Sequence, residues 1–484
     1  MPADPSLQRL GEALPRFIEL FKPIVRFFPD IKKPERKVSF NEKLLWTALA
    51  LVLYLIMSEV PLLGVGQGGA DDPLGAMRVI FASSRGTLME LGIGPIVTAG
   101  LILQILNGSK MINVDMSNPE DRSLFTGASK VLAVGMTLFE ALAFIIGGAY
   151  GQLTVPNQLG ILVQLLAAGI ILMLLDEMLQ KGWGIGSGIS LFIAAGVVQM
   201  IWWDLIAPVG PLEDGYYLGS IIAFVQSLQV GEPLTGFVRS GGLPDMVGLI
   251  ITGVVILAVV YVSGIKVNVP VSYARYRGFR GKFPIKFLYV SNIPVIFAAA
   301  LFGNIYFITQ MMWQRYNPAN ANFWLNLLGK FSTGEGGAEP IGGLIYYLSP
   351  PRGLTALMEH PVKALIYAAF FIIVCVFFAV TWVEVGGMDA KSVSKQLIDS
   401  GMQIEGFRRS SAPIQQLLKR YIPIVTILGG VTVGAIAVFA DFLGAFGSGT
   451  GILLTVGILE QYYQLLVRER VSEMFPAVRS FLGE

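Results

Sequence analysis

Acidic and basic side chains inside long apolar runs are the residues of this sequence that could do chemistry, because ionisable groups at membrane depth bind ions or relay protons. Glu140 is the clearest of them, in the apolar run 125–149. The others lie nearer the ends of such runs: Lys130, Asp176, Glu177, Lys363, Glu384, Asp441 and Glu460. The sequence has no repeated arginine series of a voltage sensor and no TVGYG-like filter. So sparse a set argues against a transporter that couples substrate movement to ions.

Nucleophiles, metal ligands and nucleotide-binding motifs are equally scarce. Cys375 is the single cysteine and has no partner for an intrachain disulfide or a zinc site. The single histidine, His360, stands beside a proline at the start of an apolar run and is typical of a solvated loop. GWGIGSG (182–188) and GSGTG (447–451) lack the Lys-Ser/Thr ending of a phosphate-binding loop, so we expect tight turns there. We therefore expect no catalytic residue, no metal and no cofactor, and a protein that is not an enzyme.

The elements that must position these residues are membrane-spanning helices. Hydrophobic residues make up 54% of the 484 positions and charged residues 14%, with a mean hydropathy of +0.65. Soluble domains carry about 25% charged residues. The sequence predicts an all-α polytopic membrane protein with ten transmembrane helices. Their predicted ranges are 44–64, 91–107, 125–149, 158–176, 188–208, 246–264, 288–311, 362–385, 421–441 and 446–467.

The N-terminal segment, 1–43, is predicted to be cytoplasmic and amphipathic, and not a cleavable signal peptide. Its apolar side chains recur at steps of three or four, with basic residues between them: Leu7, Leu10, Leu14, Phe17, Ile18, Phe21 and Val25. Two interpretations stay open. The segment forms a helix in the plane of an anionic leaflet, or it packs on cytoplasmic loops.

Most of the 35 Lys and Arg residues fall in loops on one side of the predicted spans. The positive-inside rule makes that side cytoplasmic, together with both termini. Two of these loops, 264–287 and 386–420, are long and rich in Gly and Arg. Part of their charge sets topology, but their length predicts docking of a polyanion, either RNA or an acidic protein surface.

The predicted spans divide into a first half, 44–210, and a second half, 246–467, with an external linker, 211–245, between them and a cytoplasmic tail, 468–484, after them. Five spans per half force the halves into opposite orientations, as in an inverted repeat. GIGPIVTAGLI and SNIPVIFAAAL echo each other with their prolines in register. A channel, a secondary transporter with inverted repeats, and an insertase or scaffold without a pore are the competing functions.

Long motifs in the same order resemble the SecY family, the α subunit of the Sec protein-conducting channel: TLMELGIGPIVTAGLILQIL, GWGIGSGISLFIAAG, FPIKFLYVSNIPVIFAAALF, GFRRS…LKRYIP and GTGILLTVGILEQYYQLL. The resemblance covers nearly the whole chain from about residue 38 and is weakest in 312–345. NPEDRSLFTGASK resembles the archaeal and eukaryotic branch. The resemblance implies two inverted five-helix halves that form an hourglass channel with a plug helix. Such a channel conducts secretory polypeptides across the membrane and releases transmembrane segments into lipid through a lateral gate.

The resemblance also assigns roles to residues. The family's apolar pore ring matches Ile93, Val97, Ile189, Ile193, Ile296 and Leu454. Its plug matches residues near 70–85, with Leu74, Met77, Val79, Ile80 and Phe81. Its polar lateral-gate cluster matches Thr98, Glu140 and Asn292. An apolar ring resists ions by dewetting when it is empty. Gly92, Gly94 and Pro95 would then mark the break between the plug and the second span, which membrane depth tolerates only against protein or a water-filled cavity.

The remaining implications concern partners. The family's ribosome-docking surface matches Arg275, Arg277, Arg280, Lys282, Arg408 and Arg409. Arg and Lys contacts to rRNA phosphates would be salt-sensitive and independent of sequence. The resemblance also implies a SecE or γ subunit, a small β subunit, signal sequences and nascent polypeptides as substrates, and a multi-pass location in the plasma membrane.

Overall fold

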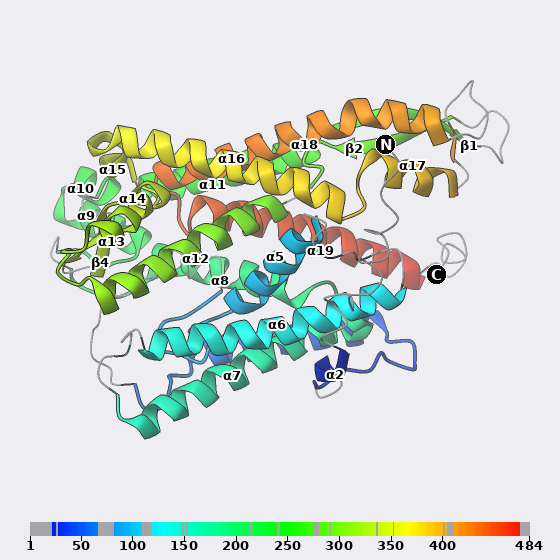
Figure 1. Ribbon diagram of the computed structural model, residues 1–484. Helices are drawn as coiled ribbons and strands as arrows, with labels where there is room; N and C mark the ends of the chain where they lie inside the picture. The colour runs from blue at the N-terminus through cyan, green and yellow to red at the C-terminus, as the bar shows by residue number, and fades with distance from the viewer. Residues whose placement is uncertain are drawn as a thin grey trace.

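Ten long helices, all running roughly along one axis, form the body of the protein in this computed structural model (Figure 1). The structure describes residues 22–25, 28–65, 82–108, 112, 114, 119–146, 150, 153–212, 215–239, 243–273, 280–290, 292–334, 337–351, 353–399, 402–403 and 411–474. Within these residues, eight helices are long and apolar enough to cross a membrane. The predicted all-α, polytopic architecture is confirmed.

Each predicted span overlaps one of the ten helices. The first half holds α3 (Phe40–Glu59), α5 (Gly94–Gly108), α6 (Pro119–Ile146), α7 (Val155–Met178), continued by the π-helical turn η2 (Leu179–Trp183), and α8 (Gly188–Ile206). The second half holds α11 (Met246–Gly264), α12 (Ile293–Tyr316), α16 (Pro361–Val385), α18 (Ser411–Phe442) and α19 (Gly449–Met474). Helices α18 and α19 run beyond the predicted 421 and 467, because helical turns continue where the hydropathy signal ends.

The starts of several spans follow from local sequence. Ser39 accepts a hydrogen bond from the Glu42 N–H at 3.3 Å and caps α3. Asp245 accepts one from the Gly248 N–H at 2.7 Å and caps α11. Helices α7, α12 and α16 carry proline in their first turn, where no intrahelical donor is lost. These signals fix where the chain enters each helix.

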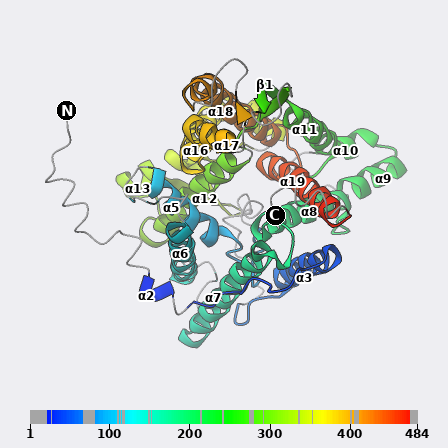
Figure 2. The same ribbon diagram turned by 90° about the vertical axis from the view of Figure 1, so that its right-hand side faces the viewer.

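The two halves meet along two seams, which are visible when the bundle is viewed end-on (Figure 2). At one seam, here called the front seam, α5 packs against α12 and α16. At the other, the back seam, α8 packs against α19. One continuous apolar core with side chains from both halves lies between the seams.

The two basic loops join at one end of the bundle. The loop after α11 forms a hairpin of β1 (Lys266–Tyr273) and β2 (Arg280–Lys286), which pair antiparallel. The loop after α16 holds α17 (Ala390–Asp399) and a short strand β5 (Met402–Gln403), which pairs with the far end of β1. Loops far apart in sequence thus form one sheet of order β2-β1-β5. We call it the basic sheet.

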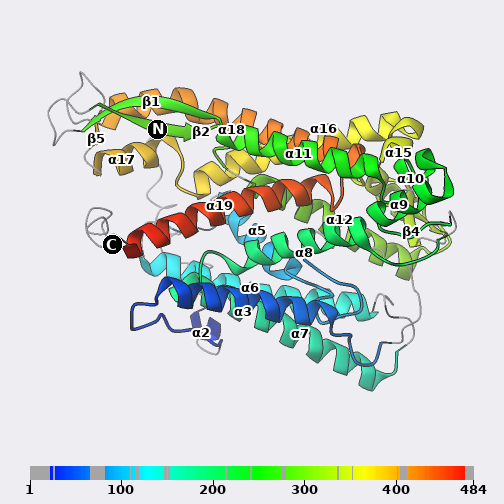
Figure 3. The ribbon, with the colours of Figure 1, turned by 180° about the vertical axis from the view of Figure 1, so that it is seen from behind.

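The opposite end of the bundle carries short elements (Figures 1 and 3). The linker predicted at 211–245 holds two helices, α9 (Ser220–Val230) and α10 (Pro233–Phe237). The connection from α12 to α16 holds α13 (Phe323–Leu328), a hairpin of β3 (Lys330–Gly334) and β4 (Gly337–Gly342), α14 (Leu344–Leu348) and α15 (Gly353–Glu359). These helices are too short to give a periodicity signal that stands out beside the spans.

The described part of the N-terminal segment packs on the first half. Helix α2 (Lys22–Val25) lies on α6, where a Cβ added to Gly127 would meet the Val25 side chain at 2.9 Å. Lys22 faces Glu120 at 3.8 Å, and Trp183 donates to the Lys32 carbonyl at 2.9 Å. These contacts favour the second interpretation, packing on the protein, for residues 22–39. The apolar positions from Leu7 to Phe21 lie outside the described residues.

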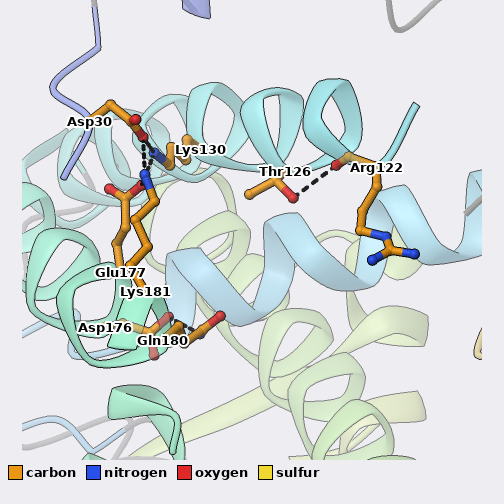
Figure 4. Close-up of polar contacts among 8 residues, drawn as sticks. All are labelled: Asp30, Arg122, Thr126, Lys130, Asp176, Glu177, Gln180 and Lys181. Atoms are coloured by element: carbon orange, nitrogen blue, oxygen red, sulfur yellow. Dashed lines mark hydrogen bonds and ion pairs between the residues drawn. The ribbon is translucent and has the colours of Figure 1, made fainter. Parts of the chain in front are cut away.

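Four charged side chains fasten this segment to α6 and α7 (Figure 4). Lys130 contacts Asp30 at 2.9 Å and Glu177 at 2.5 Å, and Lys181 contacts the same two carboxylates at 2.6 Å and 2.9 Å. A hydrogen bond with Glu177, followed by those with the Lys181 and Lys130 ammonium groups, holds the pKa of Asp30 well below its usual 3.8. The pKa of Asp30 is lower in the folded protein than in the unfolded chain, so its ionised carboxylate stabilises the folded protein above about pH 4. This stabilisation is lost progressively as the pH falls from there toward the lowered pKa.

We expect Asp30→Asn to loosen residues 28–39 without unfolding the bundle, because it removes the charge that the two lysines share. Amide hydrogen exchange in this segment at neutral pH should accelerate by about two- to fivefold, as for a partly exposed ion pair. Glu35→Gln, in the exposed part of the same segment, is the matched control. Equal exchange rates in wild type and Asp30→Asn would contradict the assigned role.

Candidate functional site

The six residues predicted for the pore ring, here called the waist, all belong to the apolar core that the two halves share or pack against it. Ile93 precedes α5 and Val97 lies on it, Ile189 and Ile193 lie on α8, Ile296 lies on α12 and Leu454 lies on α19. Ile93, Val97, Ile193 and Leu454 are buried, and Ile189 and Ile296 are half-buried and pack against the same cluster. Their four helices come from both halves and surround the middle of the bundle in the end-on view (Figure 2). An apolar constriction of this kind excludes ions when it is dry.

The mouth of α5 is broken as the sequence predicts. Gly92 has a φ of +54°, and the helix begins only at Gly94, with Pro95 in its first turn. The N–H of Val97 bonds to the Ile93 carbonyl at 3.0 Å, so the ring residue Ile93 itself accepts the first bond of the helix. The glycine therefore allows the turn that aims Ile93 into the core.

The residues before this turn are hydrogen-bonded to the residues that directly follow α3, an arrangement here called the clasp to α3. Leu62 N–H donates to the Gly86 carbonyl at 2.8 Å, and Leu88 N–H donates to the Val60 carbonyl at 3.0 Å. Deeper in, the buried Tyr54 hydroxyl donates to the Ala82 carbonyl at 3.2 Å. The predicted plug residues Leu74, Met77, Val79, Ile80 and Phe81 lie outside the described residues, between these anchored ends.

The first residues of α8 donate hydrogen bonds to a buried carboxylate of the preceding helix, α7. Asp176 on α7 accepts the Ile189 N–H at 3.0 Å, the Ser187 hydroxyl at 3.1 Å and the Gln180 amide at 2.7 Å. Figure 4 shows the bond between Asp176 and Gln180. Because Ile189 is also a ring residue, Asp176 fixes the position at which α8 enters the waist.

The second half repeats this arrangement at the start of α19. Asp441 on α18 accepts the Gly449 N–H at 2.7 Å. Gly186 and Gly447, which stand just before the two helices, both have positive φ, 73° and 66°. A Cβ added to Gly449 would lie 2.1 Å from the Ala437 carbonyl oxygen, so the helix passes very close to its predecessor. The two glycine-rich motifs are tight turns, as expected from the sequence, and each is paired with a carboxylate that sequence reasoning placed only near a span end.

The back seam joins the halves by polar contacts. The Tyr462 hydroxyl of α19 donates to the Ser187 carbonyl at 2.6 Å. Lys43 on α3 contacts Glu469 on α19 at 2.8 Å. The first bond connects the entrance of α8 to the body of α19, and the second connects α3 to the end of α19.

The three predicted gate residues have different surroundings in the structure. Thr98 on α5 accepts from the Asn304 amide of α12 at 3.1 Å, a partner that the sequence analysis missed. Asn292 donates to the carbonyls of Leu453 and Leu454 at 3.1 and 3.4 Å, and so contacts α19. Glu140 is buried on α6, and its Oε1 has no hydrogen-bond partner within the described part of the chain. Grouping of the three into one polar cluster stays a prediction.

The front seam is closed and mainly apolar. Phe144 on α6 stacks on Phe307 of α12 with ring centroids 4.9 Å apart. A cavity of only about 10 Å³ remains between α5, α12 and α16, lined by Leu101, Gln104, Ile105, Phe297, Phe378, Thr381, Trp382 and Val385. Such a volume is at the lower limit for one water molecule. The two sides of this seam are therefore in van der Waals contact.

Two of the six predicted docking residues lie in the basic sheet, and the other four lie outside the described residues. Arg280 and Lys282 lie on strand β2. Arg275, Arg277, Arg408 and Arg409 lie outside the described residues. Because β1 pairs with β5, both loops that carry these residues start from one sheet. Among the residues that the structure describes, no three His, Cys, Asp or Glu side chains gather as a metal site.

Two sequence profiles match the chain. The one described as SecY matches residues 87–463, and the one described as the plug domain of Sec61p matches residues 52–86. Together they include the broken mouth of α5, the clasp to α3 and all six ring positions.

Solved structures agree with the profiles. A structure described as that of a protein-conducting channel aligns with a TM-score of 0.80. A SecY structure whose plug domain is described as stabilising the closed channel and maintaining a membrane seal gives 0.79, and Sec61 in the canine ribosome-channel complex from the endoplasmic reticulum gives 0.78. Each is 42% identical, and each alignment covers 94% of this chain and 99% of the other. The likeness to Sec61 agrees with the archaeal and eukaryotic branch that the sequence indicates.

We expect Asp441→Ala to destabilise the protein by about 1–3 kcal/mol, the usual cost of leaving a buried N–H, here that of Gly449, without its acceptor. The freed start of α19 should also displace Leu454, so that ion flux through the resting protein rises in proteoliposomes. Asp441→Asn, which keeps an acceptor oxygen, is the matched control and should stay close to wild type. An alanine variant that is destabilised but no leakier would show that the cap stabilises the fold without setting the waist.

Proposed function

Because this chain belongs to the SecY family of protein-conducting channel subunits, we propose that polypeptides cross the membrane through the waist formed by Ile93, Val97, Ile189, Ile193, Ile296 and Leu454. The single observation that carries this proposal is that these six branched aliphatic side chains come from both halves and all belong to, or pack against, the one apolar core that the halves share. Such side chains have no fixed polar geometry and close around any passing sequence. The plug segment would seal the empty pore from one side of this ring.

The front seam is the proposed lateral gate. A transmembrane segment can leave the pore toward lipid only where the halves separate without exposing charge to the acyl chains. The seam of α5 and α6 against α12 and α16 offers an aromatic stack and one neutral hydrogen bond between Thr98 and Asn304. Buried Glu140 beside this seam would be satisfied by water or by a passing segment when the gate opens.

The proposed location is the plasma membrane, with both termini and the basic sheet on the cytoplasmic side. Positive charge in the two long loops supports this orientation. The proposed partners are a SecE or γ subunit, a small β subunit and a ribosome. The similarity to Sec61 in a ribosome-channel complex supports the last of these.

Site-specific photo-crosslinking tests the proposed path. A photoreactive residue at position 193, in membranes that hold a secretory chain arrested midway through translocation, should crosslink to that chain. Deleting the signal sequence should abolish the crosslink, and a probe at Leu257, exposed on the outer face of α11, is the control that should stay silent. If the chain is proven to be arrested and no crosslink forms from position 193, 93 or 454, the polypeptide does not pass through the waist and the proposed path is wrong.

Charge reversal tests the proposed docking surface. Arg408→Glu with Arg409→Glu should weaken ribosome binding about tenfold and flatten its dependence on salt, because phosphate contacts release fewer counterions. Arg315→Glu with Lys330→Glu makes the same change of charge at the opposite end of the bundle and should leave binding unaltered. Binding that is unaffected by the first pair and insensitive to salt would contradict docking through these loops.

A further inference from the structure

Helix α9 exposes bulky apolar side chains and buries small polar ones. A helix on the surface of a soluble protein does the reverse. Ile221, Val225 and Leu228 stand at steps of four and three, and their side chains are 40%, 47% and 52% exposed. The opposite face, with Ser220, Ala223 and Ser227, is buried. The exposed stripe is therefore built into a helix whose polar face is already used by the fold.

Helix α10 extends the apolar surface. Leu234 is 79% exposed and Val238, just after the helix, is 59% exposed. Residues 215–231 contain no charged side chain. Glu232, at the junction of the two helices, is exposed, and the apolar stripes lie on either side of it along the chain. An apolar surface of two helices is larger than the scattered single apolar residues that water tolerates.

Specific contacts hold the pair in place. The Tyr216 hydroxyl lies 3.0 Å from the Thr235 hydroxyl, and a Cβ added to Gly236 would overlap the Ser227 side chain. The buried Arg239 guanidinium donates to the carbonyls of Leu218 and Pro244, both at 3.0 Å. The apolar stripe is thus presented by an ordered platform, and turning it inward would break these bonds.

The position of α9 and α10 indicates what their apolar surface contacts. Helices α9 and α10 lie at the end of the bundle opposite the basic sheet, beside α8 and α11 and at the rim of the end-on view (Figures 2 and 3). Helix α11 begins next to them and carries its own exposed stripe of Ile250, Val254 and Leu257. Because α11 is a membrane-spanning helix, its stripe faces the acyl chains, and the apolar surface of α9 and α10 continues it toward the bilayer edge.

We propose that α9 and α10 form a membrane-surface anchor, with Ile221, Val225, Leu228 and Leu234 inserted at the boundary of headgroups and acyl chains in the leaflet opposite the basic sheet. An 11-residue helix is too short to span the bilayer, and an in-plane helix with one apolar face is the form that binds such a boundary. The anchor sits on the only chain segment that joins the two halves. It therefore fixes the depth of that connection while the front seam opens.

Depth-resolved fluorescence tests the anchor in the complete complex. Leu228→Cys, made in a Cys375→Ala background, would carry an environment-sensitive dye in phosphatidylcholine and phosphatidylglycerol vesicles. Gln229→Cys, an exposed polar neighbour on the same helix, is the matched control. We expect a blue-shifted emission at 228, iodide quenching roughly fivefold weaker than at 229, and stronger quenching by nitroxides near the headgroup end of the lipid chains than by those near the methyl end.

Each other result overturns the proposal. Equal iodide quenching at 228 and 229 would place the stripe in water. Protection from iodide without quenching by any lipid nitroxide would mean that another protein subunit covers the stripe. Unchanged polypeptide translocation by both labelled variants verifies that the complex is intact in either case.

Discussion

A helix that starts inside a membrane-embedded bundle leaves its first N–H groups without carbonyl partners, and this constraint shapes the waist of the protein. Water cannot satisfy those groups once the bundle is closed. Asp176 supplies an acceptor for the start of α8, and Asp441 together with the Ser448 hydroxyl supplies acceptors for the start of α19. Since Ile189 and Ile193 follow the first cap and Leu454 follows the second, half of the apolar ring depends on two buried carboxylates. The arrangement is the same in both halves. Asp176 on α7 binds the start of the next long helix, α8, and Asp441 on α18 binds the start of the next long helix, α19.

The two seams differ in the kind of contact that crosses them. Across the back seam run a charged pair, Lys43 with Glu469, and the bond from Tyr462 to the Ser187 carbonyl. The ion pair is partly exposed, with the Glu469 side chain 39% accessible, so water screens it and its contribution is at most about 1 kcal/mol. Across the front seam run a stack of Phe144 on Phe307 and one neutral bond. Lipid or an apolar helix can replace such packing, which agrees with the proposal that the lateral gate lies at the front seam.

The two ends of the bundle face different surroundings. One end gathers the basic loops on a single sheet, although the loops are separated by two membrane-spanning helices. The other end carries short apolar helices, including the platform of α9 and α10 held by Arg239. At the first end, charge favours water and polyanions. At the second, exposed Leu and Val side chains favour the lipid boundary.

The sequence by itself determined the membrane environment, the ten helices, the turns at the two glycine-rich motifs and the break before α5, because hydropathy, proline and glycine act over a few residues. Its motifs also determined the family, and with it the positions proposed for the ring. Tertiary structure decided which side chains meet. Asn292 turned to the α19 backbone and Thr98 to Asn304, since hydrogen-bond partners depend on how helices pack and not on their periodicity. It also decided that β1 pairs with β5, and that α9 turns its apolar face outward, because long-range pairing and burial are properties of the assembled bundle.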